Sequence, residues 1–90
     1  MKRCVKLLIS GRVQGVYFRY FTQQKAKELG VFGSVRNLED GRVEVFAEAE
    51  AAALNAFISW CHKGPVTARV TGVEISELEH STGLTSFVKQ

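Results

Sequence analysis

The sequence predicts an α+β fold, a sandwich in which two helices cover one face of an antiparallel sheet of four to five strands. Three features of the chain lead to this prediction. Apolar residues alternate in several short segments, two longer segments carry apolar residues at helical spacing, and glycine-containing turns separate the segments. With 90 residues the chain can form one small core, so we expect a single domain over residues 1–90.

The first strand is predicted over residues 4–10. Val5, Leu7 and Ile9 would share one face of this strand, because successive side chains of a strand point to opposite faces. Leu8 adds an apolar side chain to the other face. We therefore expect this strand to be central in the sheet and partly covered on both sides.

A helix is predicted over residues 18–30. The apolar stripe of this helix consists of Phe18, Phe21 or Thr22, Ala26 and Leu29. Gly30 is a natural end for the helix, because glycine readily adopts the left-handed conformation that closes many helices.

Two further strands are predicted over residues 31–38 and 43–48. The turn between them contains Asp40-Gly41, and an Asp-Gly pair between two such segments is a strong hairpin signal. In the second of these strands, small apolar residues alternate with charged ones. We expect Glu44 and Glu48 on a solvated face of the sheet.

The second half of the chain predicts a second helix over residues 50–63, which Gly64-Pro65 ends. Its apolar stripe consists of Leu54, Phe57, Ile58 and Cys61. A long fourth strand over residues 68–78, a polar connection and a short last strand over residues 87–90 complete the chain. Three aromatic side chains are expected in hydrophobic packing, namely Phe21, Phe57 and Trp60.

The order strand–helix–strand–strand–helix–strand is that of the ferredoxin-like βαββαβ fold. A right-handed crossover makes strands one and two parallel, with strand three inserted between them. The carboxyl ends of strands one and two then lie at the same edge of the sheet. The first of these ends carries the loop of residues 10–19, and the second carries Asn37. We therefore expect Asn37 to lie near that loop.

The loop before the first helix has the features of a phosphate site. Gly11 and Gly15 let a ligand approach the backbone closely, and the start of the helix leaves N–H groups without partners. Those N–H groups and the helix dipole attract anions. Arg19, just inside the helix, adds a permanent positive charge with a forked set of donors.

The composition narrows the class of partner. The net charge of +3 and the pI of about 9.1 favour anionic partners without identifying one.

Cys4 and Cys61 form no C-x-x-C pair, and two buried thiols are favoured over a disulfide. His62 and His80 have no neighbouring ligands that would indicate a metal site. No segment is long and apolar enough to span a membrane, so we expect a cytoplasmic protein.

Two stretches of the chain resemble the signatures of the acylphosphatases. Residues 11–19, with the sequence GRVQGVYFR, resemble the first signature, and residues 33–37 followed by 41–43 resemble the second. The resemblance covers nearly the whole chain, including its length and order of elements. The sequence departs from the family pattern at Ser34, where an aromatic residue is usual, and at Ala49, where glycine is usual.

The resemblance implies hydrolysis of the carboxyl–phosphate bond of acyl phosphates, giving a carboxylate and inorganic phosphate, with no metal or organic cofactor. It implies that Arg19 binds the phosphate and that Asn37 holds the attacking water. The backbone amides of the phosphate loop would be those of Gln14, Gly15, Val16, Tyr17, Phe18 and Arg19. We expect a monomeric, stand-alone enzyme whose partners are an acyl phosphate and inorganic phosphate or a similar anion, without nucleic acid or membrane.

The chemistry of the reaction agrees with these roles. An acyl phosphate has a good leaving group, so its hydrolysis depends mainly on stabilising phosphoryl charge and aligning a water molecule. The loop and Arg19 would stabilise the charge. Asn37 would align the water, because an amide is too weak a base to remove a proton.

Several alternatives remain open from the sequence. Arg19 could be a solvated residue at a helix start, and Asn37 could simply cap a turn. Gln14 could contribute only its backbone, and Tyr17 could shape a pocket for the acyl group while Phe18 belongs to the core. The domain could also be a non-catalytic phosphate sensor or an RNA-binding module, although no strand carries the aromatic pair that RNA-binding sheets use.

Overall fold

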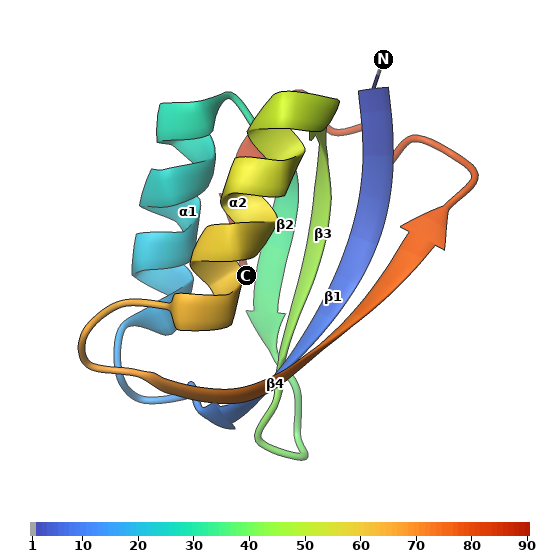
Figure 1. The fold of residues 1–90 in the computed structure, drawn as a ribbon. Helices are drawn as coiled ribbons and strands as arrows, with labels where there is room; N and C mark the ends of the chain where they lie inside the picture. The colour runs from blue at the N-terminus through green and yellow to red at the C-terminus, as the bar shows by residue number, and fades with distance from the viewer. Residues whose placement is uncertain (1) are drawn as a thin grey trace.

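The computed structural model describes residues 2–90 and has the predicted order of elements, including the short last strand (Figure 1). The elements are β1 (Lys2–Arg12), α1 (Phe18–Leu29), β2 (Phe32–Asn37), β3 (Val43–Glu50), α2 (Ala51–Lys63), β4 (Arg69–Leu78) and β5 (Phe87–Lys89). The boundaries agree with the predicted ones to within two residues. Helix α1 ends at the expected glycine, since Gly30 has a φ of 73° and its N–H bonds to carbonyls of the last turn.

The sheet contains five strands in the order β4-β1-β3-β2-β5. Strand β1 lies between β3 and β4, so the prediction of a central first strand is confirmed. Strand β3 pairs antiparallel with both β1 and β2, which makes β1 and β2 parallel to each other, as the predicted topology requires. The α+β, ferredoxin-like fold is thereby confirmed.

The prediction of a wholly antiparallel sheet is wrong at one edge, because β5 pairs in parallel with β2. The reason is the direction of the chain after β4. Strand β4 runs opposite to β2, and the chain then reverses direction and crosses to the far edge of the sheet. A strand that arrives there after one reversal runs the same way as β2.

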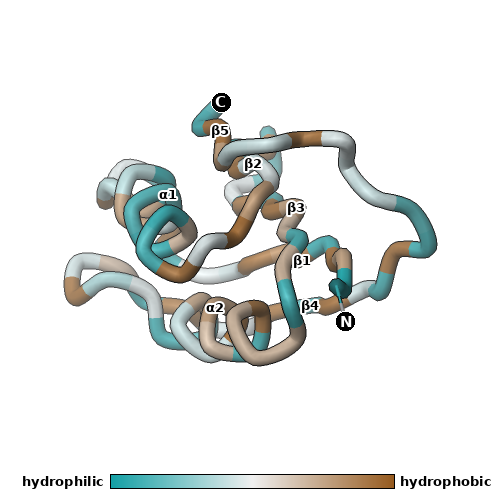
Figure 2. The backbone as a smooth tube through the Cα atoms, turned by 90° about the horizontal axis from the view of Figure 1, so that it is seen from above, coloured by the Kyte–Doolittle hydropathy of each residue, from teal (hydrophilic) through white to brown (hydrophobic). Residues whose placement is uncertain are grey.

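Both helices lie on one face of the sheet, and the chain between β4 and β5 passes across the opposite side (Figure 2). The core lies between the helices and the sheet. The predicted inward face of β1 is fully buried, because Val5, Leu7 and Ile9 have no exposed surface. Strand β3 adds Val43 and Val45 to the same layer.

The helices contribute the predicted stripes, with one choice now decided. On α1 the buried residues are Phe18, Thr22 and Ala26, whereas Phe21 is 40% exposed. Thr22 tolerates burial because its hydroxyl donates a hydrogen bond to the Phe18 carbonyl at 2.8 Å. The expectation of core packing for Phe21 is therefore wrong, and its ring packs edge-on against exposed Tyr20.

The two acidic residues expected on a solvated strand face are more enclosed than predicted. Glu44 is 9% exposed and binds Arg36 through an ion pair of 2.7 Å. Glu48 accepts a hydrogen bond from the Ser81 hydroxyl at 2.8 Å and another from the Thr82 backbone N–H. The Ser81 hydroxyl is the main cause of the lowered pKa of Glu48. The hydrogen bonds of Glu48 hold the connection between β4 and β5 against the outer face of the sheet.

Both cysteines are free and buried, which agrees with the predicted thiols. Among the described residues, no helix is long and apolar enough to cross a membrane.

Candidate active site

The loop between β1 and α1 forms one wall of a pocket at the end of the sheet. Strand β1 is irregular at Ser10/Gly11, where its pairing with β4 shifts register. The backbone then takes left-handed conformations at Gly15, with a φ of 74°, and at Tyr17, with a φ of 61°. Helix α1 has no side-chain cap at its start. Its first N–H groups therefore lack a side-chain acceptor, which is the arrangement that binds anions.

Two buried valines of this loop anchor it to the hydrophobic core. Val13 and Val16 are 1% and 7% exposed, and both belong to the hydrophobic core. The Thr67 hydroxyl donates to the Val16 carbonyl at 2.8 Å and ties the loop to the segment before β4. The loop is therefore anchored by apolar contacts and by a neighbouring segment, although it contains little regular structure.

Gln14 fastens the loop to the β2–β3 hairpin. Its side-chain amide donates hydrogen bonds to the Leu38 carbonyl at 2.7 Å and to the Arg42 carbonyl at 2.9 Å. The hairpin is itself closed by Asp40, which accepts hydrogen bonds from the backbone and the guanidinium of Arg42. The first of these bonds is the main cause of the lowered pKa of Asp40. The Gln14 side chain thus holds the loop against the hairpin and does not line the pocket.

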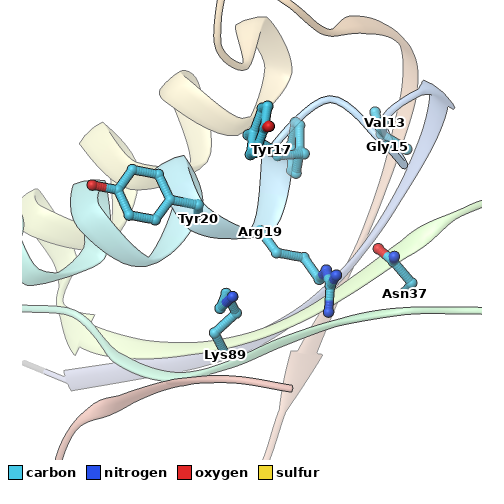
Figure 3. Close-up of a pocket in the computed structure, with 8 residues that line it drawn as sticks. Val13, Gly15, Tyr17, Arg19, Tyr20, Asn37 and Lys89 are labelled. Carbon is cyan, nitrogen blue, oxygen red and sulfur yellow. The ribbon is translucent and has the colours of Figure 1, made fainter.

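Arg19 projects from the first turn of α1 into the pocket (Figure 3). Its side chain is half-buried, and one guanidinium nitrogen donates to the backbone oxygen of Gln90. The sequence did not predict Gln90 as the partner of Arg19. Gln90 in turn donates its N–H to the Val35 carbonyl at 2.9 Å, so the end of the sheet holds the guanidinium in place.

Asn37 is the last residue of β2, and its side chain points toward the loop and the Arg19 guanidinium (Figure 3). It pairs in register with Val43 of β3, and β3 pairs with β1. This ladder brings Asn37 to the same edge of the sheet as the loop, at the position that the topology predicted.

The pocket has a volume of about 310 Å³. Its lining residues are Val13, Gly15, Tyr17, Phe18, Arg19, Tyr20, Asn37 and Lys89. Four of the six predicted loop residues are among them. Gln14 and Val16 are not, because Gln14 reaches to the hairpin and Val16 is buried. Phe18 belongs to the core, as expected, and is 1% exposed.

The lining residues define the charge of the pocket. They include two cations, Arg19 and Lys89, and no carboxylate, so the pocket favours an anion. In the described part of the chain, no three His, Cys, Asp or Glu residues gather in a way that could hold a metal ion.

The sequence did not predict that Lys89 and Tyr20 line the pocket. The register of the short strand β5 was the missing information, because only β5 places Lys89 beside β2.

Taken together, the fold and the pocket define an α+β sandwich with a cationic pocket, and comparison with known proteins identifies its family. The acylphosphatase family model matches residues 5–89. The chain is 53% identical to an acylphosphatase of Rubrobacter xylanophilus, over 92% of this chain and 76% of that protein. It is 49% identical to an acylphosphatase of Methylococcus capsulatus, over 97% of this chain and 94% of that protein.

A solved structure gives the same result. The crystal structure of an acylphosphatase from Bacillus subtilis superimposes with a TM-score of 0.94 and 36% identity, over 100% of this chain and 99% of that one. The chain belongs to the acylphosphatase family.

Proposed function

We propose that this protein hydrolyses the carboxyl–phosphate bond of acyl phosphates without a metal ion, and that Arg19 and Asn37 carry the reaction. Membership of the acylphosphatase family makes the chain a hydrolase of acyl phosphates. One observation supports the residue roles above all others. Arg19 and Asn37 line a single pocket together with Gly15 of the loop.

The loop and Arg19 would hold the phosphoryl group. Backbone N–H groups at the start of α1 donate to phosphoryl oxygens, and the guanidinium adds a charge-assisted hydrogen bond. Because Arg19 is held by the backbone oxygen of Gln90, it needs little reorganisation when charge develops. The predicted phosphate-binding role of the amides of residues 14–19 is kept as part of this proposal.

Asn37 would position the water. The water oxygen attacks phosphorus, the bond from phosphorus to the acyl oxygen breaks, and the carboxylate leaves with the bonding electrons. Asn37 orients the water through its side-chain amide but cannot take its proton, because an amide is too weak a base. The proton passes to solvent or to a phosphoryl oxygen.

The remaining parts of the proposal concern the molecule as a whole. We infer that residues 1–90 act as one monomeric domain, and that inorganic phosphate or a similar anion also occupies the loop. The two free, buried thiols support a reducing compartment, and hence the cytoplasm. The RNA-binding and sensor alternatives are not favoured by the family assignment.

The test is hydrolysis of benzoyl phosphate in the presence of a chelator. Loss of one preorganised donor at such a site costs about 2.7–4 kcal/mol, so Arg19→Ala should lower kcat/KM at least about a hundredfold. Asn37→Ala should lower kcat strongly while inorganic phosphate still inhibits. Arg12→Ala is the matched control, because Arg12 is exposed outside the pocket and should keep normal activity.

Circular dichroism would establish that each variant is folded. Near-normal turnover by folded Arg19→Ala or folded Asn37→Ala would remove that residue from the mechanism. Activity that disappears with the chelator would contradict the metal-independent reaction.

A further inference from the structure

We propose that Lys89 determines specificity, selecting acyl phosphates whose acyl group carries a second negative charge, such as a free carboxylate. This inference rests on the proposed function, because it concerns the same pocket. It goes beyond that function by naming the class of acyl group and the residue that reads it.

Lys89 lies on the inward face of β5. Its neighbour two residues back, Phe87, shares this face, since side chains alternate along a strand. Phe87 is 3% exposed and packs edge-on against Phe57 of α2, with ring centroids 5.8 Å apart. The same face of β5 therefore points toward the helices, and at Lys89 it opens into the pocket.

The backbone of β5 is fixed on both sides. The Gly33 N–H donates to the Ser86 carbonyl at 3.0 Å, and the Gln90 N–H donates to the Val35 carbonyl at 2.9 Å. On the helix side, the Gln23 amide donates to the Phe87 carbonyl at 3.0 Å. The Cα atom of Lys89 is thus held in place, while its side chain is exposed and can reach a ligand.

No acidic side chain is paired with Lys89 in the described structure. No ion pair within residues 2–90 involves Lys89, whereas Lys25 is paired with Glu28 at 2.8 Å. No acidic residue lines the pocket. The ammonium group has three donors to offer to an incoming anion.

The position of Lys89 along the sheet places it apart from the water-binding residue. Its partner in β2 is Val35, two residues before Asn37. Two residues along a strand and one strand across correspond to about 8 Å between the Cα atoms of Lys89 and Asn37. In Figure 3, the Arg19 guanidinium lies between these two side chains.

The geometry of the reaction then assigns the acyl group to the side of Lys89. In an in-line displacement, the attacking water and the leaving carboxylate lie on opposite sides of phosphorus. If Asn37 holds the water and Arg19 the phosphoryl oxygens, the acyl group extends away from Asn37. Tyr20 and Lys89 line that end of the pocket (Figure 3). An anionic group at the far end of the acyl chain would meet the ammonium of Lys89.

The experiment compares two substrates that differ in one charge. 4-Carboxybenzoyl phosphate carries a carboxylate where 4-carbamoylbenzoyl phosphate carries a neutral amide of nearly the same shape. The wild type should prefer the charged substrate in kcat/KM by about fivefold, or about 1 kcal/mol, the upper limit for one exposed ion pair. The preference should appear mainly in KM, and high salt should weaken it.

Substitutions at Lys89 test whether this residue causes the preference for the charged substrate. Lys89→Gln should remove the preference for the charged substrate, whereas Lys89→Glu should reverse it. Lys27→Gln is the matched control, because Lys27 is an exposed lysine on α1 outside the pocket and should keep the wild-type preference.

Two results would overturn the inference. Equal losses with both substrates in Lys89→Gln would show that Lys89 acts on the phosphoryl group, and an unchanged preference would show that it does not reach the acyl group. Both results are compatible with hydrolysis of benzoyl phosphate by the wild type, so the proposed function stands or fails separately.

A binding measurement decides the inference even if the wild type hydrolyses neither substrate. The probes are the two matched β-ketophosphonates, in which a CH₂ group replaces the bridging oxygen. Calorimetry should give a tighter Kd for the carboxylated analogue, and Lys89→Gln should remove the difference. Equal affinities in the wild type would contradict the selection of a second negative charge.

Discussion

Tyr17 has a left-handed backbone conformation, with a φ of 61°, at the position just before α1. Every other residue with a positive φ in the described chain is a glycine. For a residue with a Cβ atom, this conformation costs about 1–2 kcal/mol. The ring recovers little of that cost, because Tyr17 is 75% exposed. The site therefore stores backbone strain at the start of the helix that would bind phosphate.

Tyr17→Gly should raise the free energy of unfolding by up to about 1 kcal/mol, because glycine adopts positive φ without the steric cost of Cβ. The entropy that glycine adds to the unfolded chain offsets part of the gain. Urea denaturation of the two proteins measures the difference. Tyr17→Ala is the control, since alanine removes the ring but keeps Cβ, and it should give no gain. Equal effects of both substitutions would place the cause in the ring.

Gln14 and Arg19 show how local patterns identify a residue without giving its contacts. The signature of residues 11–19 marked both residues from the sequence. The acceptors of Gln14 lie on the Leu38–Arg42 turn, and the acceptor of Arg19 is at Gln90. Such contacts across the chain depend on the finished packing, so no local pattern predicts them.

At the scale of elements, the pairing of β2 with β3 holds Asn37 at the edge of the sheet. This pairing requires a residue without a side chain at Gly33. A Cβ atom there would lie 1.8 Å from the Phe46 carbonyl oxygen, and the φ of 148° adds strain for any other residue. The two backbones approach closely at this point because no side chain separates them.

Gly33→Ala should lower the free energy of unfolding by about 3 kcal/mol or more, because the backbone oxygen cannot move aside without breaking the ladder. The matched control is Gly72→Ala in β4, where an added Cβ meets no atom within 4 Å. A surface change of that kind should stay within about 0.5 kcal/mol. Thermal and urea unfolding would compare the variants, and similar stabilities would show that β2 and β3 can separate locally.

The order and direction of the main elements could be predicted from the sequence, whereas the pairing partner of the edge strand β5 could not. Periodicity, the Asp40-Gly41 turn and the right-handed crossover rule gave the four main strands and the parallel relation of β1 and β2. Strand β5 has three residues and no clear alternation. Its partner was therefore decided by packing against β2 and α1.

For the molecule as a whole, the two cysteine thiols are buried on opposite faces of the sheet, and their reactivity measures how tightly each face is packed. Cys61 of α2 is fully buried on the helix side, and burial raises its pKa. Cys4 pairs in register with Glu48 on the outer face and is 7% exposed. Burial is also the main cause of its raised pKa, with the charge of Glu48 adding to it.

Both thiols should therefore react slowly with a thiol reagent in native protein, with Cys4 faster than Cys61, and rapidly in urea. The raised pKa values also set the sign of a pH effect. The unfolded thiols ionise near their usual value of 9.0, whereas the folded ones stay neutral to higher pH. Stability should thus be complete below pH 9 and fall as the pH rises above it.

Rates measured with Cys4→Ser and Cys61→Ser assign the two reactions, and urea unfolding from pH 7 to 10 measures the loss. Rapid native reaction of Cys61 would mean that α2 opens locally. A stability that does not change between pH 8 and pH 10 would contradict the linkage to the thiols.

The amino-acid sequence was enough to predict the α+β class, the order of the strands and helices along the chain, and the position of Asn37 near the loop that carries Arg19. These features follow from local periodicity and from the handedness of crossovers, which are properties of short segments.

The packed structure was needed to show which of several equivalent side chains face inward and which residues from distant parts of the chain reach the pocket. In the structure Thr22 is buried and Phe21 is exposed, the Gln14 side chain bonds to the β2–β3 hairpin, and Lys89 lines the pocket. Strand register and close packing depend on the whole core at once, so the apolar stripe of one helix or the pattern of one short strand does not determine them.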